Sequence, residues 1–266
     1  MVLLILLLII VLVYIIICFL FYIFQDKILF KRTHIACDFP FHYEYPFSEL
    51  FWKTDDGTVL NGLHFTVKHP KGVILFLHGN SGHMGRSGSY FKRVKDLDFD
   101  VVLYDYRGYG KSTGTPSKAT FYSDALLVYD WVKQQYPLLP IVVHGLSLGS
   151  HVAASVAAHR AISLLILETP FLNLLHIAQY RYPILPARLL LRNNMNSAEF
   201  LPLINCPIYV FHGDNDTVVP LSEAQRIPLY NGNVKMIVIR QGTHKNLHEF
   251  SEYQHTLEAI LKALNE

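Results

Sequence analysis

The sequence predicts an α/β fold, in which helices cover both faces of a mostly parallel sheet and one N-terminal transmembrane helix comes first. The main observation is a series of short apolar runs, which are typical of strands buried on both faces of such a sheet. Stretches with helical spacing or alanine-rich composition lie between several of these runs. The apolar runs cover residues 72–77, 101–104, 140–144, 162–168, 208–211 and 235–239.

Residues 1–25 carry no charged side chain and are nearly all Leu, Ile, Val, Phe and Tyr. The stretch 2–24 is long enough to cross a bilayer, which takes about 20 apolar residues. A cleaved signal peptide would show a basic start, an apolar stretch of about 7–15 residues and a small-residue cleavage site, and this segment shows none of them. We therefore expect residues 1–25 to be a transmembrane anchor, residues 26–46 a juxtamembrane linker and residues 47–266 the catalytic domain.

The charged residues and the cysteines indicate on which side of the membrane the domain lies and which partners and cross-links to expect. Lys27, Lys31 and Arg32 follow the apolar segment, so the positive-inside rule places the domain on the cytoplasmic side of the membrane. The formal net charge is +2, and no cluster of basic and aromatic residues appears, so nucleic acid is not an expected partner. The three cysteines are far apart in the sequence and predict neither a disulfide framework nor a metal site.

The remaining elements follow from turn residues and helical spacing. Two strands are expected around residues 49–54 and 59–67, joined by an Asp-Gly turn at Asp56-Gly57. Apolar residues recur at helical spacing in two further stretches, and a third stretch is rich in alanine. These three helices are expected over residues 120–135, 246–264 and 151–158.

The pentapeptide Gly145-Leu146-Ser147-Leu148-Gly149 stands between a predicted strand and a predicted helix. Strand, Gly-x-Ser-x-Gly and helix is the layout of a nucleophile elbow, whose tight turn directs the serine hydroxyl out of the sheet. The flanking residues must lack side chains because the turn leaves no room for them. The alternative is a Gly-rich turn with a structural serine. We predict that Ser147 is a catalytic nucleophile.

A serine nucleophile needs a histidine base and an acid that orients the base, in the chain order Ser, Asp, His for this layout. The loops after the last two apolar runs carry Asp214 and Asp216, and then His244. Loops at the C-terminal ends of parallel strands meet at the edge where such sheets bind ligands. We prefer His244 to His248, which is expected on the surface about one turn into the last helix. The spacing leaves Asp214 and Asp216 both open as the acid.

The strand predicted over residues 72–77 ends in His78-Gly79-Asn80-Ser81-Gly82. In a hydrolase of this architecture, the loop here supplies one backbone N–H of the oxyanion hole, and the residue after the nucleophile supplies the other. We assign these groups to Asn80 and Leu148, with a plain strand-to-helix turn as the alternative. His78 is expected to be a structural hydrogen-bonding residue.

Two other segments admit two interpretations each. Asp105 and Arg107, next to a Gly-rich loop, could form a substrate clamp, but we favour a structural ion pair that holds the loop. The apolar insertion over residues 169–197 precedes the strand that leads to the acid. It is either a core helix or a short lid over a site for an acyl chain.

From about Glu44 onward, the chain resembles the membrane-anchored α/β-hydrolase-domain serine hydrolases, which include lysophospholipid and monoacylglycerol lipases and protein depalmitoylases. In that family the acid is the aspartate of His-Gly-x-x-Asp-x-x-Val-Pro, which corresponds here to Asp216, whereas Asp214 falls on a variable position. The loop with His244 departs from the common Gly-Gly-His and Gly-His-Asn-Asp forms. The matching stretches are residues 78–80, 104–112, 145–149 and 212–220.

The resemblance implies an α/β-hydrolase fold with a short lid insertion and an acyl-transfer mechanism that needs no metal or organic cofactor. His244 would take the proton of Ser147 as the serine attacks an ester or thioester carbonyl, while Asp216 holds the imidazole in the correct tautomer. The bilayer and a lipid-like or acylated substrate are the expected partners.

The leading prediction is a membrane-anchored serine hydrolase that cleaves lipid-like carboxylic esters, such as lysophospholipids or monoacylglycerols. An acyl-protein thioesterase is the second interpretation, since it uses the same chemistry on a different leaving group. A serine peptidase and a non-catalytic membrane scaffold are the remaining alternatives. An intact set of Ser147, Asp216 and His244 argues against the scaffold, because a binding role needs none of them.

Overall fold

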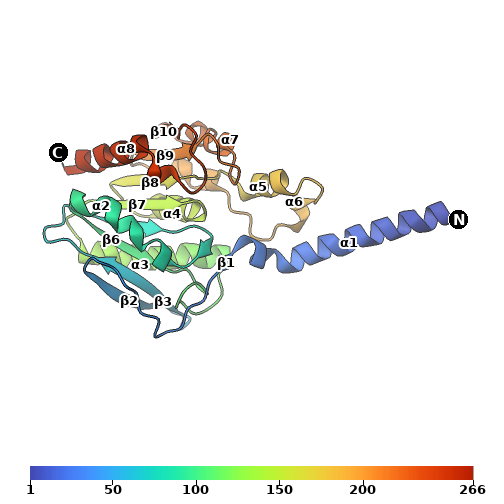
Figure 1. Ribbon diagram of the computed structural model, residues 1–266, viewed down its shortest axis with the longest axis horizontal. Coiled ribbons are helices and arrows are strands. Elements are labelled where there is room, and N and C mark those ends of the chain that lie inside the picture. The colour runs from blue at the N-terminus through green and yellow to red at the C-terminus, as the bar shows by residue number, and fades with distance from the viewer. Residues whose placement is uncertain (266) are drawn as a thin grey trace.

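The computed structural model describes residues 1–265 and, within them, an eight-stranded sheet (Figure 1). Its strands are β2 (Phe47–Lys53), β3 (Val59–Phe65), β4 (Gly72–Leu77), β6 (Phe99–Tyr104), β7 (Ile141–Leu146), β8 (Leu164–Glu168), β9 (Ile208–Gly213) and β10 (Val234–Ile239). The spatial order is β10-β9-β8-β7-β4-β6-β3-β2. All neighbours are parallel except β2 with β3 and β3 with β6. The predicted mostly parallel sheet is confirmed.

Helices cover both faces of this sheet, as predicted. In chain order the helices are α1 (Val2–Leu29), α2 (Phe91–Val94), α3 (Lys118–Gln135), α4 (Leu148–His159), α5 (Leu174–Arg181), α6 (Ala187–Leu190), α7 (Leu221–Ala224) and α8 (Ser251–Lys262). Alternate residues of β4 point to opposite cores. Val73 and Leu75 pack in the core that contains residues of α3 and α4, and Ile74 and Phe76 pack in the core that contains residues of α2 and α8. Burial on both faces explains why the strand is apolar throughout.

The last helix is shorter than predicted. Residues Leu247–Glu249 form a separate 3₁₀ turn, Phe250 has an extended backbone, and α8 begins only at Ser251. Leu247 has the helical spacing of a core residue, but it is fully buried beneath the preceding loop, against Gly242. The expected helix over residues 246–264 was therefore wrong in its first turn. Leu247 is apolar because it packs against the loop at Gly242, and its helical spacing to the later apolar residues does not reflect a helix.

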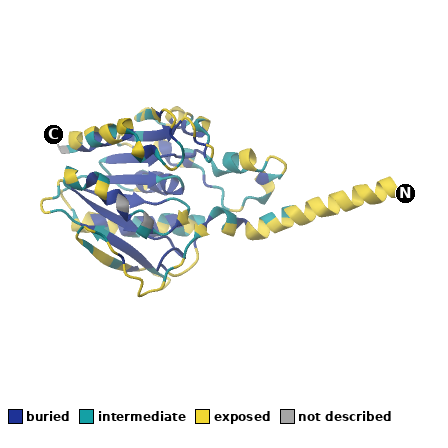
Figure 2. Cartoon of the chain, in the orientation of Figure 1, coloured by how far each residue is buried: buried dark blue, intermediate teal, exposed yellow. Residues whose placement is uncertain are grey.

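The N-terminal helix α1 extends away from the domain and is almost wholly exposed (Figure 2). Its most apolar stretch has a mean hydropathy of 3.7 and no buried residue, so its length and composition suit a membrane span. The helix continues to Leu29, beyond the segment of residues 1–25 predicted from the sequence. The short strand β1 (Lys31–Arg32) then pairs with β5 (Ser81–Gly82), which attaches the start of the expected linker to the domain.

His151 lies one turn after Ser147 in α4 and is completely buried. Its ring nitrogens contact the hydroxyl groups of Tyr122, at 2.6 Å, and of Ser197, at 2.9 Å. Burial lowers the pKa of His151 to about 3. The folded protein therefore keeps this imidazole neutral at pH values where the unfolded chain protonates it.

The stability of the protein should consequently fall as the pH drops from about 6.5, because the unfolded state gains a proton that the folded state does not bind. One histidine contributes a slope of up to about 1.4 kcal/mol per pH unit over this window. We expect His151→Asn to reduce the slope by roughly this amount in urea unfolding of the full chain, followed by tryptophan fluorescence. His255→Asn, at an exposed position of α8, is the control. An unchanged slope in His151→Asn would contradict the assignment.

Candidate active site

The chain turns sharply at Ser147, between the end of β7 and the start of α4. Ser147 has φ 52° and ψ −112°, a left-handed conformation that costs a non-glycine residue on the order of 1–3 kcal/mol. Its backbone N–H donates to the carbonyl of Glu168 on the neighbouring strand at 2.9 Å. The turn therefore has the shape of the predicted nucleophile elbow.

The two glycines of the pentapeptide are required by close backbone contacts. A Cβ atom on Gly149 would lie 2.0 Å from the carbonyl oxygen of Leu77 on β4. A Cβ atom on Gly145 would lie 2.2 Å from the carbonyl oxygen of Gly149 itself. Neither position has room for a side chain, because the helix start is packed directly on the strand ends.

Three predicted residues meet at the C-terminal edge of the sheet. The Nε2 atom of His244 lies 3.1 Å from the Oγ atom of Ser147. The Nδ1 atom of His244 lies 2.7 Å from the Oδ2 atom of Asp216. An ionised carboxylate only accepts hydrogen bonds, so Nδ1 carries the proton and Nε2 is free to accept from the serine hydroxyl.

Asp216 is buried and held by its own loop. Its Oδ1 atom accepts hydrogen bonds from the backbone N–H groups of Val218, at 2.8 Å, and Val219, at 2.9 Å. Burial raises the pKa of this carboxyl group, but the hydrogen bond from His244 and those from the two amides outweigh it, so the pKa lies below its usual value. Asp216 is thus ionised at neutral pH and fixed in orientation.

Neither competing candidate, Asp214 as the acid or His248 as the base, takes part in the hydrogen bonds that join Ser147, His244 and Asp216. Asp214 is exposed, and its carboxylate accepts a hydrogen bond from the backbone N–H of Gln241. His248 was predicted on the surface of the last helix, but the structure places it elsewhere. It is half-buried in the 3₁₀ turn before α8 and lines the cavity at Ser147. Burial lowers its pKa, and the nearby charge of Arg93 lowers it further.

The backbone of the loop after β4 lies against the serine. A Cβ atom on Gly79 would be 3.7 Å from the Cβ atom of Ser147, and Asn80 lines the same cavity. Within residues 1–265, the backbone N–H groups of Asn80 and Leu148 donate to no protein acceptor. The two groups assigned to the oxyanion hole are therefore unpaired, and the assignment remains a prediction.

The end of α1 holds this loop, which the sequence did not indicate. The side-chain amide of Asn80 donates to the carbonyl of Leu29 at 2.9 Å. The carbonyl of Asn80 accepts from the backbone N–H of Lys31, at 2.9 Å, and from the hydroxyl of Tyr109, at 3.0 Å. The apolar N-terminal helix and the loop beside Ser147 are consequently linked by direct hydrogen bonds.

The predicted ion pair of Arg107 exists, but its partner is different. Arg107 donates to both carboxylate oxygens of the buried Asp124 on α3, at 2.8 and 2.9 Å, and also pairs with Asp56. Asp105 instead accepts from the backbone N–H of Met84 and lies 3.3 Å from Nε2 of His78. The predicted pair between Asp105 and Arg107 was therefore wrong, because the guanidinium group of Arg107 binds the carboxylate of Asp124, which lies 17 residues further along the chain.

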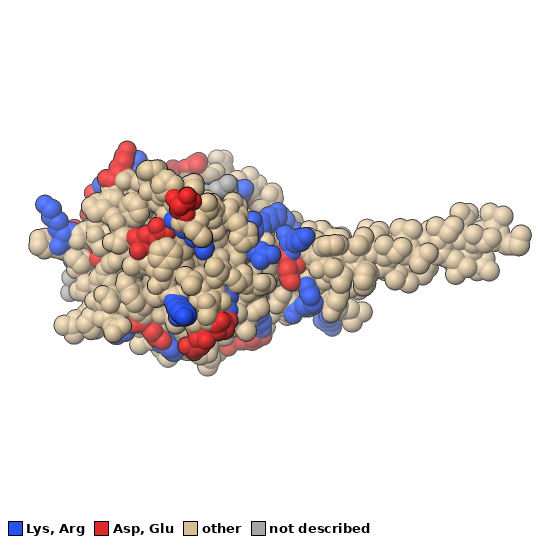
Figure 3. Space-filling model, turned by 90° about the horizontal axis from the view of Figure 1, so that it is seen from below, with Lys and Arg blue, Asp and Glu red and all other residues tan. Residues whose placement is uncertain are grey.

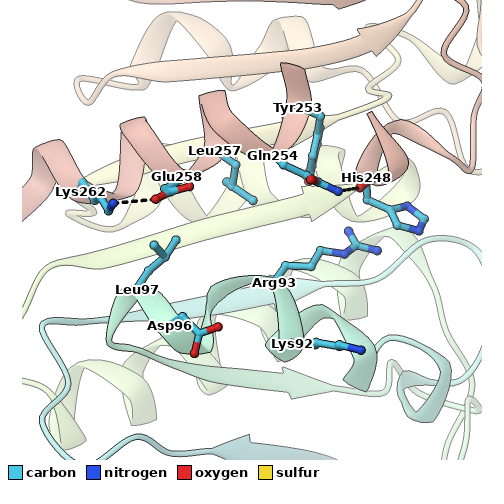
Figure 4. Close-up of a pocket in the computed structure, with 10 residues that line it drawn as sticks. All are labelled: Lys92, Arg93, Asp96, Leu97, His248, Tyr253, Gln254, Leu257, Glu258 and Lys262. Atoms are coloured by element: carbon cyan, nitrogen blue, oxygen red, sulfur yellow. Dashed lines mark hydrogen bonds and ion pairs between the residues drawn. The ribbon is translucent and has the colours of Figure 1, made fainter. Parts of the chain in front are cut away.

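The cavity at Ser147 has a volume of about 480 Å³ and is lined by four basic side chains. They are Lys31, Arg93, Arg181 and Lys245. No carboxylate within residues 1–265 forms an ion pair with any of the four. A second pocket, of about 580 Å³, lies between α2 and α8 and shares Arg93 and His248 with this cavity (Figure 4). The serine itself lines only the smaller of the two.

Glu168 is the acidic residue in the lining of the cavity, and its carboxylate is held by neighbouring side chains. Its Oε2 atom accepts from the hydroxyl of Tyr253 at 2.7 Å and lies 3.2 Å from Nε2 of His144. The Nδ1 atom of His144 in turn contacts the hydroxyl of Tyr90 at 2.7 Å. Burial lowers the pKa of His144, which favours the neutral ring. Sequence reasoning missed this network because its members come from four distant segments.

No group of three His, Cys, Asp or Glu side chains in the described part of the chain is placed to hold a metal ion. The polar groups around Ser147 are instead hydrogen-bond donors and cations, which suit an anionic ligand.

Comparisons with known proteins agree with this architecture. The family model described as serine aminopeptidase, S33 (Hydrolase_4) matches residues 68–198. The uncharacterized protein Rv2307c of Mycobacterium tuberculosis is 31% identical over 220 residues, which cover 80% of this chain and 78% of that protein. The lysophosphatidylserine lipase ABHD12 of Danio rerio is 35% identical over 185 residues, covering 61% of this chain and 47% of the lipase. The chain thus spans about half the length of that lipase.

Solved structures show the same fold. The esterase Pf2001 of Pyrococcus furiosus superposes with a TM-score of 0.73 and 19% identity, covering 90% of this chain and 98% of the esterase. A thermostable carboxyl esterase of Bacillus coagulans superposes with a TM-score of 0.67 and 18% identity, covering 83% of this chain and 99% of that esterase. These distant likenesses establish the architecture.

Proposed function

The chain belongs to the α/β-hydrolase family and is an esterase-type hydrolase, and we propose that it is a membrane-anchored serine hydrolase that cleaves lipid carboxylic esters through an acyl-enzyme. The observation that carries the proposal is the series of hydrogen bonds from Ser147 through His244 to Asp216. Ser147 and His244 line a cavity that can receive a substrate. Such a series of hydrogen bonds activates a hydroxyl group for attack on a carbonyl carbon.

In the first step, Oγ of Ser147 forms a bond to the ester carbonyl carbon while Nε2 of His244 takes the hydroxyl proton. The negative charge that develops on the carbonyl oxygen faces the backbone N–H groups of Asn80 and Leu148, and each such donor is worth about 3 kcal/mol in related chemistry. Asp216 stabilises the imidazolium that forms. The imidazolium then returns its proton to the leaving alcohol as the carbon–oxygen bond breaks.

In the second step, water attacks the acyl-serine, and His244 again takes the proton. The tetrahedral intermediate collapses as the imidazolium returns this proton to Oγ of Ser147, which releases a fatty acid and regenerates the free serine and the neutral His244. The same sequence of bond changes applies to a thioester, with a thiol as the leaving group. A test of the proposal must therefore compare ester and thioester substrates.

A membrane lipid is the proposed source of the ester. Helix α1 is 28 residues long, or about 42 Å at 1.5 Å per residue, which exceeds the hydrocarbon thickness of a bilayer. We place the boundary of the anchor near Gln25, where polar residues begin. The catalytic domain is assigned to the cytoplasmic side because Lys27, Lys31 and Arg32 follow the span.

The four basic side chains of the cavity support a substrate with an anionic head group. Arg93 extends from α2 to the region shared by the cavity and the second pocket (Figure 4). The ABHD12 relatives are lysophosphatidylserine lipases by name, and lysophosphatidylserine has an anionic head group. We therefore assign anionic lysophospholipids as the preferred substrate class.

Replacing the nucleophile should abolish turnover. We expect Ser147→Ala to lower kcat by about 10⁴-fold or more and to remove labelling by a fluorophosphonate probe, because the attacking oxygen is gone. Ser81→Ala, at a second serine of the same cavity, should keep both. The substrates are lysophospholipids, monoacylglycerols and acyl-cysteine thioesters. Failure of the folded wild-type protein to react with the probe or any substrate would refute the proposal.

The two candidate acids should respond differently to amide substitution. Asp216→Asn removes the charge that orients His244, so kcat should fall by about 10³–10⁴-fold. Asp214→Asn changes an exposed residue on the same loop and should retain nearly full kcat. Equal losses in the two variants would argue against Asp216 as the acid.

Arg93 should contribute to head-group recognition. We expect Arg93→Gln to reduce kcat/KM for an anionic lysophospholipid about tenfold, the scale of one hydrogen bond to a charged group. Hydrolysis of an uncharged monoacylglycerol should change little. The exposed neighbour Lys92, which lines only the second pocket, supplies the control Lys92→Gln. A similar loss on both substrates would indicate a structural role for Arg93.

A further inference from the structure

The distal part of the insertion, residues 182–191, lies along α1 and not on the sheet (Figure 1), whereas both ends of the insertion, at Phe171 and Met195, are buried in the core. No residue of α5 is buried, and Ala187 is the buried residue of α6. The interpretation of this segment as a core helix is therefore wrong. The first turn of α5 still packs against the domain through Leu174 and Ile177. The distal part of the insertion contacts the apolar helix α1.

Direct contacts fix the distal part of the insertion on α1. The hydroxyl of Tyr14 donates to the carbonyl of Ile184 at 2.8 Å. The rings of Phe21 and Tyr182 meet edge to face at 5.0 Å between centroids. Further toward the domain, Gln25 bridges two residues of the insertion: its amide donates to the carbonyl of Leu190, and its carbonyl accepts from the backbone N–H of Arg192.

These contacts show how far along the axis of α1 each residue of the insertion lies. Gln25 is the first polar residue after the apolar stretch, and the next residue, Asp26, forms an ion pair with Arg192. Tyr14 lies eleven residues before Gln25 in the same helix, or about 16 Å along its axis. Ile184, which is bonded to Tyr14, therefore lies beside a part of α1 that must be in hydrocarbon if the helix spans a bilayer.

The side chains of this segment have the exposure expected of a lipid-facing surface. Ile184 is 79% exposed, Leu189 81% and Tyr180 62%. Lys and Arg side chains gather where α1 meets the domain, and the helix beyond is free of them (Figure 3). This distribution matches a membrane in which basic side chains meet the head groups and apolar side chains lie deeper.

Several backbone groups around Ile184 are satisfied, which matters in an apolar medium, where unpaired polar groups are costly, and within residues 1–265 the N–H of Ile184 itself has no partner. The N–H groups of Leu185 and Ala187 donate to carbonyls within the insertion. Pro183 and Pro186 have no N–H to satisfy. The carbonyl of Ile184 is satisfied by Tyr14 from outside the segment.

We propose that residues 182–191 are immersed in the bilayer leaflet next to the catalytic domain, together with α1, so that lipid surrounds Ile184. Arg188, the exposed basic residue of this segment, lies two residues before Leu190, which is bonded to Gln25 at the boundary, so its long side chain reaches the head groups. The proposal rests on the membrane anchor of the proposed function and adds a second membrane-embedded element. Arg181, at the end of α5, lines the cavity of Ser147. A lipid ester can thus pass from the leaflet, along the insertion, to the serine without entering bulk water.

Fluorescence quenching by depth tests the proposal. The full chain, with Cys18, Cys37 and Cys206 replaced by alanine, carries one new cysteine labelled with an environment-sensitive fluorophore. The protein is reconstituted in vesicles of phosphatidylcholine and phosphatidylserine that contain a nitroxide-labelled acyl chain. The reporters are Ile184→Cys in the insertion, Ile9→Cys in the apolar stretch of α1, and Leu229→Cys, 80% exposed on the domain.

We expect quenching at positions 184 and 9 and none at position 229. Quenching at position 9 alone would overturn the immersed insertion and leave the anchor intact. No quenching at positions 9 and 184 would refute the anchor of the proposed function and the present proposal with it. Leu189→Cys provides a second reporter in the insertion if Ile184→Cys fails to fold, and the same outcomes apply to it.

A functional measurement adds an independent criterion. We expect Ile184→Asp to lower the hydrolysis of a long-chain ester presented in vesicles about tenfold or more, because a charge at this depth is costly. Hydrolysis of a water-soluble short-chain ester should remain at the wild-type rate, since Ile184 does not line the cavity. An equal rate of vesicle hydrolysis in the variant and the wild type would overturn the proposal.

Discussion

The turn at Ser147 holds a left-handed backbone conformation, and the arrangement of the site depends on it. The conformation persists because β7 and α4 are buried on both sides of the turn and because Gly145 and Gly149 permit direct backbone contact. The hydroxyl then points to the sheet edge where the loops with Asp216 and His244 arrive. The packing of the sheet and α4 thus holds Ser147 in its strained backbone conformation.

Polar groups around this turn are paired in a way that preserves its geometry. Asp216 is fixed by two backbone amides, so its second oxygen remains available to His244. Glu168 accepts a hydrogen bond from Tyr253 and lies beside a neutral His144, and, against the effect of burial, the charge of Arg93 helps to keep its pKa low, although no ion pair joins the two side chains. The cavity thus carries four basic side chains and one carboxylate, an excess of positive charge that suits the anionic substrate proposed above. Asn80 adds a direct link, since its side chain donates to Leu29 at the end of α1 and its carbonyl accepts from Lys31 of β1.

Much of the fold was predictable because its strands have a local signature. Alternate residues of β4 enter two different cores, so an uninterrupted apolar run marks the strand, and the predicted bounds of residues 72–77 coincide with it. The same reasoning failed at Leu247, whose apolar side chain fits a helical pattern but packs under a loop. It failed also for Arg107, because a charged side chain gives no indication of which distant carboxylate will reach it.

The sequence by itself determined the features that depend on near neighbours: the Gly-x-Ser-x-Gly turn at Ser147, the apolar N-terminal segment and most strands. Spacing left Asp214 and Asp216 equivalent, and only resemblance to a family separated them. The tertiary structure distinguishes them by geometry, because only Asp216 is buried within hydrogen-bonding distance of His244, and the acid role proposed for Asp216 rests on this contact. It also decided that the insertion lies on α1, since contacts between segments more than 160 residues apart leave no pattern in the local sequence.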